Sequence, residues 1–179
     1  MRTTWMVLAA LLTVSCRSAG PYGHSKVYSP LGDEEHAIEG NQQYDSLLAE
    51  RSFDKVKGKS VWLFGVVTNR GSGPGGAAYI AVSLRTLQLR NLCDSDDEDT
   101  CRVTVSDREM GRVHVLVSLS ADDDLGEHSV GIGSLVRVVG AVTSDIDPID
   151  GTPIIRVNYY RHWPRGFYVT TKAAGALKR

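Results

Sequence analysis

From residue 60 onward, apolar and polar residues alternate with a period of two, and this pattern constrains the fold more than any other feature of the chain. The clearest run is Val113, Val115, Val117 and Leu119, which leaves His114 on the opposite face. Because successive side chains of a strand point to opposite faces of a sheet, such runs predict strands with one buried face. Further runs cover residues 61–68, 80–85, 87–90, 103–106, 135–142 and 154–160. No long helical period interrupts them, so the sequence predicts a mainly β, mostly antiparallel fold.

Five segments resemble the strands of an OB-fold, a small five-stranded barrel. The fourth of them is flanked by Gly133 and Gly140, a pattern common in that family, and the fifth begins at Gly151. In strand order, the segments are residues 59–67, 103–107, 111–115, 133–142 and 151–155. The resemblance spans residues 59–163 and implies a small OB-like antiparallel barrel with an enlarged insertion at residues 70–100. A β-sandwich would give much the same alternation and stays open as an alternative.

The first sixteen residues are typical of an export signal. Arg2 is followed by a nearly uninterrupted apolar run at residues 5–14, which is shorter than the roughly 20 residues that a membrane-spanning helix needs. Residues 12–16, which end in Cys16, resemble the lipobox of bacterial lipoproteins, with Thr13 where leucine is commonest. The resemblance implies a signal peptide at residues 1–15 and lipidation of Cys16. The alternative is ordinary secretion, with Cys16 as an unmodified cysteine.

The residue that follows the lipidated position bears on the membrane that receives the protein. Arg17 stands there instead of aspartate, which by the same resemblance favours the outer membrane, on a face that the sequence leaves undetermined. Two or three acyl chains would anchor the protein stably, since each buried methylene contributes about 0.8 kcal/mol. The sequence therefore predicts a membrane partner reached through the lipid anchor.

Two cysteines remain besides Cys16, and they bracket an acidic stretch. Cys93 and Cys101 enclose residues 94–100, which have the composition of a loop between two strands. An even pair in an exported protein favours a disulfide. A redox-active pair is the alternative, but the acidic neighbours would raise the pKa of a thiol and lower its reactivity. We therefore predict a structural disulfide within the insertion.

The remaining composition divides the chain into parts. Residues 16–40 are rich in glycine and proline and predict a flexible, lipidated tether. Tyr44, Leu47 and Leu48 have helical spacing, so residues 41–58 are predicted to contain a short helix and a linker. Residues 59–179 then form the OB-like β domain with a C-terminal extension.

Net charge and motifs restrict the function. The chain carries a net charge of −1, and without residues 1–15 it keeps 19 basic and 21 acidic side chains, so we expect no nucleic-acid partner. No two of the five histidines have the spacing of metal ligands, and no nucleophile elbow or phosphate-binding loop is present. The sequence therefore predicts a protein that is not an enzyme and has no cofactor and no metal.

Acidic loops leave calcium open as an alternative. Carboxylates cluster at residues 94–99 and 122–124 and at Asp145, Asp147 and Asp150, and such hard oxygen ligands suit Ca²⁺. Neither the glycine nor the distal glutamate of an EF-hand accompanies them. Exposed turns rich in aspartate usually serve turn formation and solubility.

The segment from Tyr159 to Tyr168 is dense in aromatic and basic side chains. Such chemistry occurs in protein contacts and in sugar stacking, and Arg161, Trp163 and Arg165 form a candidate interface. Alternatively, the aromatic residues close the barrel core. We predict that Trp163 packs in this core and that Arg161 and Arg165 keep surface roles.

Taken together, these features predict a membrane-anchored, non-catalytic envelope lipoprotein that acts as a binding or scaffolding module. Its expected partner is another envelope protein, and an accessory role in a surface, motility or secretion machine is an extension from location alone. The alternative function is a glycan- or calcium-binding envelope module.

Overall fold

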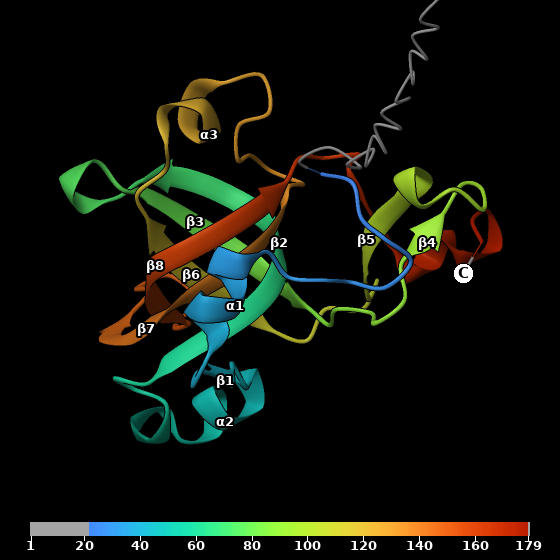
Figure 1. The fold of residues 1–179 in the computed structure, drawn as a ribbon. Coiled ribbons are helices and arrows are strands. Elements are labelled where there is room, and N and C mark those ends of the chain that lie inside the picture. Colours follow the sequence, from blue (N-terminus) through green and yellow to red (C-terminus); the bar gives the residue numbers. More distant parts are fainter. Residues whose placement is uncertain (1–21, 179) are drawn as a thin grey trace, which may run out of the picture.

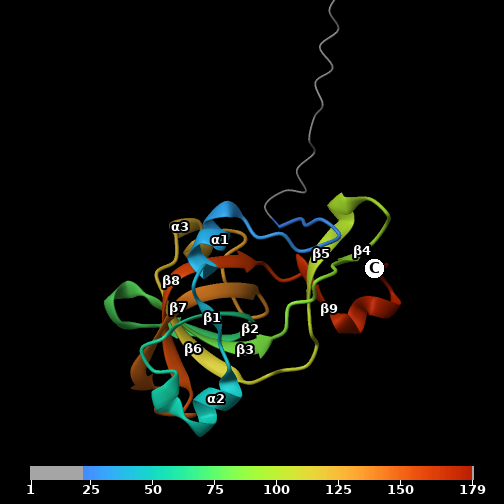
Figure 2. The ribbon, with the colours of Figure 1, turned by 60° about the horizontal axis from the view of Figure 1, so that its bottom comes forward.

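The computed structural model describes residues 22–178 of the chain, and these residues fold into a β-barrel with a smaller sheet at its side (Figures 1 and 2). The α-helices are α1 (Gly32–Ile38), α2 (Ser46–Arg51) and α3 (Ala121–Leu125). The strands are β1 (Gln42–Gln43), β2 (Ser60–Ser72), β3 (Ala78–Arg85), β4 (Leu92–Cys93), β5 (Cys101–Val105), β6 (Arg112–Val117), β7 (Leu135–Ile146), β8 (Pro153–Trp163) and β9 (Tyr168–Thr170). Short 3₁₀ turns cover Phe53–Lys55, Pro74–Gly76, Glu98–Thr100 and Thr171–Gly175.

The barrel consists of five strands in the order β2-β3-β6-β8-β7, and β7 pairs again with β2 to close it. The β6–β8 pair is parallel, whereas the other four pairs of the barrel are antiparallel. Numbered within the barrel, this order is 1-2-3-5-4-1, which is the strand order of an OB-fold. The predicted fold class is therefore confirmed, and closure of the sheet excludes the β-sandwich alternative.

Alternating side chains of the barrel strands fill its interior, as the period of two predicts. Ile80 and Val82 on β3 and Val113 and Val115 on β6 are at most 1% exposed and belong to the main core. Gly65 on β2 lies close against β3, and a Cβ there would come within 2.7 Å of the carbonyl oxygen of Ser83. The glycine therefore permits the tight coiling of the first barrel strand.

The second barrel strand is β3, which corrects the assignment of residues 103–107 to that position. Val103 and Val105 lie instead on β5, in a three-stranded side sheet of order β4-β5-β9 (Figure 2). The insertion therefore occupies residues 86–111, between the second and third barrel strands. Both segments alternate equally well, so the sequence pattern could not show which of them pairs with β2.

The disulfide between Cys93 and Cys101 is present and joins β4 to β5, as predicted for the insertion. The side sheet packs on the barrel through a second apolar core. Val103 and Val105 contribute to it from β5, together with Phe64, Leu135 and Trp163 from the barrel strands. The insertion is thus an integral layer of the domain.

Residues 22–43 lie against the barrel, where the sequence predicts a flexible tether up to residue 40. Tyr28 packs into the second core, and Glu34 on α1 is completely buried. The prediction and the structure differ because glycine and proline content indicates only local flexibility. The burial of Tyr28 and Glu34 depends on strands that are distant in the sequence. The signal peptide, the lipobox and Cys16 lie outside the described residues.

The predicted short helix is α2, and the Asp45 side chain accepts a hydrogen bond from the backbone N–H of Leu48 at its N-terminus. Within residues 22–178, no helix combines the length and apolar character that crossing a membrane requires.

Candidate binding surface

The outer face of β3 and β6 is a candidate site, because OB-folds commonly bind ligands there and on the adjoining loops. Since the alternate residues of both strands fill the barrel, the remaining ones point outward. On β3 and β6 these are Tyr79, Ala81, Ser83, Arg85, Arg112, His114 and Leu116. The loop between β7 and β8 borders this face.

Tyr79 and His114 form a stacked pair at the centre of the face. Their ring centroids are 4.9 Å apart and the ring planes differ by 3°. Ala81 is the direct partner of His114 across the two strands, so Tyr79 is its diagonal neighbour. His114 is only 9% exposed, and nothing in the alternating pattern of its strand predicts what covers it.

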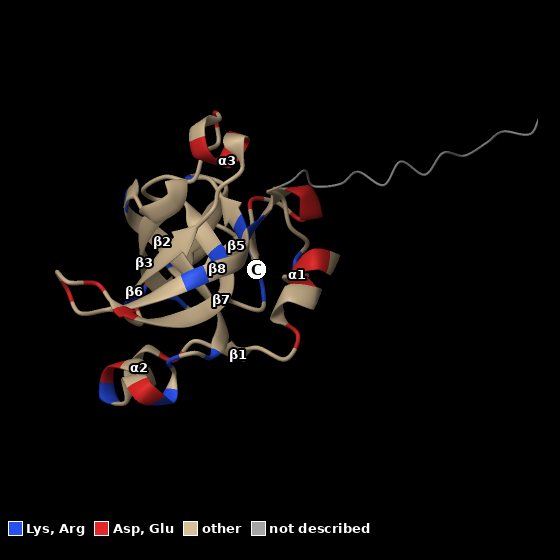
Figure 3. Ribbon diagram, turned by 90° about the vertical axis from the view of Figure 1, so that its left-hand side faces the viewer, with Lys and Arg blue, Asp and Glu red and all other residues tan. Residues whose placement is uncertain are grey.

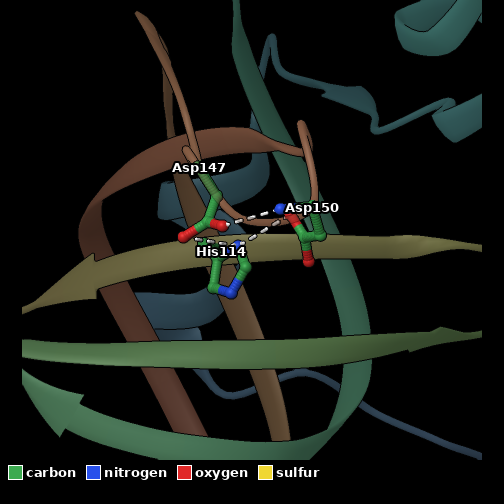
Figure 4. Close-up of side chains that lie close together, drawn as sticks. All are labelled: His114, Asp147 and Asp150. Atoms are coloured by element: carbon green, nitrogen blue, oxygen red, sulfur yellow. Dashed lines mark hydrogen bonds and ion pairs between the residues drawn. The ribbon is translucent and has the colours of Figure 1, made fainter.

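The β7–β8 loop, residues 147–152, places Asp147 and Asp150 beside His114 (Figure 4). Asp147 Oδ1 accepts hydrogen bonds from the backbone N–H groups of Ile149 and Asp150, at 2.8 and 3.1 Å. Its other oxygen, Oδ2, accepts the hydroxyl of Tyr79 at 2.6 Å. Asp147 is 5% exposed, so the loop is pinned to the barrel by a buried carboxylate.

These contacts change the pKa values of Asp147 and Tyr79. The hydrogen bond from Tyr79, together with those from the backbone of Ile149 and Asp150, lowers the pKa of Asp147 to about 2. Burial, and then the hydrogen bond to Asp147, raises the pKa of the Tyr79 hydroxyl. At neutral pH the loop therefore presents a charged carboxylate to a protonated tyrosine.

His114 also lies close to both aspartates of the loop. Its Nδ1 is 3.8 Å from Asp147 Oδ2 and 3.8 Å from Asp150 Oδ1. The same nitrogen is 2.9 Å from the Thr152 hydroxyl oxygen, and that hydroxyl donates to Asp150 Oδ1 at 2.7 Å. An imidazole and two carboxylates thus converge beside one hydroxyl.

Next to this cluster lies an apolar groove of about 430 Å³. It is formed by α2, the turn that precedes β6, and the ends of the β7–β8 loop. Leu47, Met110 and Ile146 line it and are 55%, 48% and 52% exposed. Exposed apolar residues gathered around a hollow are typical of interaction sites. Asp150 and Thr152 line the groove as well, so the groove and the histidine cluster adjoin.

The interface residues expected from the sequence lie on another side of the barrel. Trp163 is fully buried in the second core, with its ring 6.1 Å from that of Phe64. The guanidinium of Arg161 lies 4.6 Å from the Trp163 ring, and its side chain is largely buried. Of the three expected residues, only Arg165 is exposed.

Glu34 explains the burial of Arg161. Its carboxylate is paired with Arg161 at 3.0 Å and with Arg137, while Tyr28 donates a hydrogen bond to it. Burial raises the pKa of Glu34, but the Tyr28 hydrogen bond and the charge of Arg137 outweigh that effect, and the pKa is lowered. This ionic cluster holds α1 to β7 and β8.

Sequence reasoning missed the cluster around His114 and the groove. Asp147 and Asp150 were recognised as a group, but His114 is more than thirty residues away along the chain. The parallel pairing of β6 with β8, in which His114 is opposite Ile154, brings them together. The site could have been predicted from the sequence only if the parallel pairing of β6 with β8 had been predicted first.

No protein-family model and no curated protein sequence matches the chain. Solved structures do resemble it. A lipoprotein of Klebsiella pneumoniae, proposed to bind nucleic acid, is 19% identical over 75% of this chain and 99% of its own, with a TM-score of 0.39. PriB of Ralstonia solanacearum is 13% identical over 57% of this chain and 95% of its own, with a TM-score of 0.29. The single-stranded DNA-binding protein of Thermus aquaticus is 20% identical over 60% of this chain and 51% of its own, with a TM-score of 0.30.

These likenesses correct one expectation. The expectation that nucleic acid is no partner is contradicted: a single-stranded DNA-binding protein is among the structures that resemble this chain, and the net charge does not exclude such a partner. The net charge is a sum over the whole chain and does not describe any one face. Figure 3 shows acidic residues on α1 and α3 and basic ones on β8, of which Arg161 is largely buried against Glu34.

Proposed function

We propose that this protein is a non-catalytic binding module of the cell envelope. Lipidated Cys16 would hold it at the outer membrane, and its barrel would bind a partner protein through the apolar groove. A role as an accessory part of a surface, motility or secretion machine would follow from that location.

The groove is the observation that carries this proposal. Leu47, Met110 and Ile146 are about half exposed and gather around a hollow of about 430 Å³. Removing such a patch from water contributes about 25 cal/mol per Å² of apolar area. Arg112 and Glu50 lie at the edge and supply the polar contacts that give an apolar site its specificity.

Site-specific photo-crosslinking in intact envelopes tests the groove. A photoreactive residue at Met110 should give a discrete adduct with one protein, which Leu47→Asp abolishes. The matched control is Leu125 on α3, an apolar residue that is 87% exposed at the opposite end of the barrel (Figure 1). A probe there should give no such adduct.

Two results would overturn the proposal. One is the same set of adducts from Met110 and Leu125. The other is saturable binding of a fluorescent single-stranded oligonucleotide that Leu47→Asp abolishes, because that would assign the groove to nucleic acid.

The anchor is tested separately. Cys16→Ala should remove labelling by an alkyne fatty acid and leave the protein unprocessed. Labelling that persists in this variant would exclude lipidation at Cys16.

A further inference from the structure

We propose that His114, Asp147 and Asp150 form a binding site for a divalent transition-metal ion, with Zn²⁺ as the representative. Figure 4 shows the three side chains converging, one from β6 and two from the β7–β8 loop. One ligand atom of each lies within 4.8 Å of the other two. The proposal concerns a site beside the groove and does not depend on what the groove binds.

The distances suit a small ion. His114 Nδ1 is 3.8 Å from a carboxylate oxygen of each aspartate. Tetrahedral Zn²⁺ with bonds of about 2.1 Å holds its ligand atoms about 3.4 Å apart. The two distances from His114 therefore have to contract by only a few tenths of an ångström, and the carboxylate oxygens of the two aspartates lie within 4.8 Å of one another. Asp150 is exposed, and its Oδ1 accepts hydrogen bonds from the backbone N–H and the hydroxyl of Thr152 on the same loop. The adjustment therefore moves these two loop residues together.

The donor set selects the class of metal. Imidazole nitrogen suits Zn²⁺, Cu²⁺, Fe²⁺ and Ni²⁺, whereas Ca²⁺ takes six to eight oxygen ligands. The described residues supply one nitrogen and two carboxylates here, with the Thr152 hydroxyl 2.9 Å from Nδ1. That is too few oxygens for calcium. Three protein ligands and an open position are instead common for zinc.

Further contacts hold two of the proposed ligands, His114 and Asp147, in place. Tyr79 stacks on the His114 ring and donates its hydroxyl to Asp147 Oδ2, while two backbone N–H groups hold Asp147 Oδ1. Such outer contacts orient metal ligands and strengthen binding. A loop that needed only solubility would not require a buried, charged carboxylate aimed at a histidine.

Asp145 provides a matched comparison within the same segment. It is an exposed aspartate at the end of β7, and its carboxylate has no hydrogen bond or ion pair among the described residues. Replacing either Asp145 or Asp150 by asparagine removes one negative charge from the same surface. Only Asp150 belongs to the proposed site, so the pair separates coordination from general electrostatic attraction.

Metal titration of the full chain tests the site. The protein, purified without a histidine tag and freed of metal with EDTA, is titrated with Zn²⁺ by calorimetry and with Co²⁺ by visible absorption. We expect one ion per chain and the visible bands of a low-symmetry Co²⁺ site. Asp150→Asn and His114→Gln should each weaken Zn²⁺ binding by at least about tenfold. Asp145→Asn should leave it unchanged.

Circular dichroism and a thermal melt of each variant show whether it folds. If His114→Gln does not fold, the comparison of Asp150→Asn with Asp145→Asn still tests the site. Zn²⁺ binding should also weaken on acidification, because a protonated imidazole has no lone pair for the metal. Absence of saturable Zn²⁺ binding would overturn the proposal. So would an equal loss in Asp145→Asn, or Ca²⁺ binding that is tighter than Zn²⁺ binding.

Discussion

Truncation of Trp163 to alanine should destabilise the domain strongly, because this side chain joins the barrel to the side sheet. Trp163 is 0% exposed and packs among Phe64, Val103, Val105 and Leu135. A buried tryptophan removes about 150–250 Å² from water, which at about 25 cal/mol per Å² contributes roughly 4–6 kcal/mol. Large aromatic truncations in cores cost about 3–5 kcal/mol, so we expect a loss of about 4 kcal/mol.

Trp163→Phe is the informative control. The indole Nε1 is buried and has no hydrogen-bond acceptor among the described residues. An unsatisfied buried donor costs about 1–3 kcal/mol, so phenylalanine removes that cost while it keeps most of the packing. We expect Trp163→Phe to lose less than about 1.5 kcal/mol.

Urea denaturation with the disulfide intact measures both variants. With a slope of about 2 kcal/mol per molar, Trp163→Ala should lower the unfolding midpoint by roughly 2 M, and Trp163→Phe by less than about 0.8 M. An unchanged midpoint for Trp163→Ala would refute the assignment of this residue to the core. Equal losses for the two variants would refute the role given to the unsatisfied indole N–H.

Three further predictions concern other parts of the fold. Replacing Cys93 and Cys101 by serine should cost about 2.5 kcal/mol, the chain-entropy value for a loop of this length, and reduction of the native protein should lower its urea midpoint equally. Glu34→Ala leaves two buried arginines without their partner and should cost about 3–5 kcal/mol; a cost below 1 kcal/mol in urea denaturation would contradict the buried ion pairs. The pKa of Asp147 is about 2 in the folded protein against about 3.9 unfolded, so its stabilisation is present above pH 4 and lost as the pH falls toward 2. Acid titrations followed by circular dichroism should show that Asp147→Asn removes this part of the pH dependence and that Asp145→Asn does not.

The strands of the barrel were largely readable from the sequence. The alternation around Val113 and Val115 and the glycine-flanked run 133–142 correspond to β6 and β7, because a half-buried strand needs that period whatever its partners are. The turn at Asp150-Gly151 was also readable, and Gly151 has φ +70°, which glycine adopts without strain. The disulfide followed from the number of cysteines and the short stretch between Cys93 and Cys101.

The pairing of these strands was decided only by the tertiary structure. Residues 80–84 and 103–105 alternate alike, but the apolar face of β3 packs in the main core of the barrel, whereas that of β5 packs in the second core. Residues 22–43 fold onto the barrel because Glu34 finds two arginines on β7 and β8. Local composition carries no information about such distant partners.

The same distinction applies to the candidate sites. The sequence alone identified the acidic loop and the histidines, and it assigned them separate, unremarkable surface roles. The parallel pairing of β6 with β8 sets His114 beneath the β7–β8 loop, and the hydrogen bond from Tyr79 orients Asp147 toward it. The sequence determines the residue types, and therefore which metal ions His114, Asp147 and Asp150 can ligate. Closure of the barrel sets the distances between these three side chains, so only the folded chain brings them together as a site.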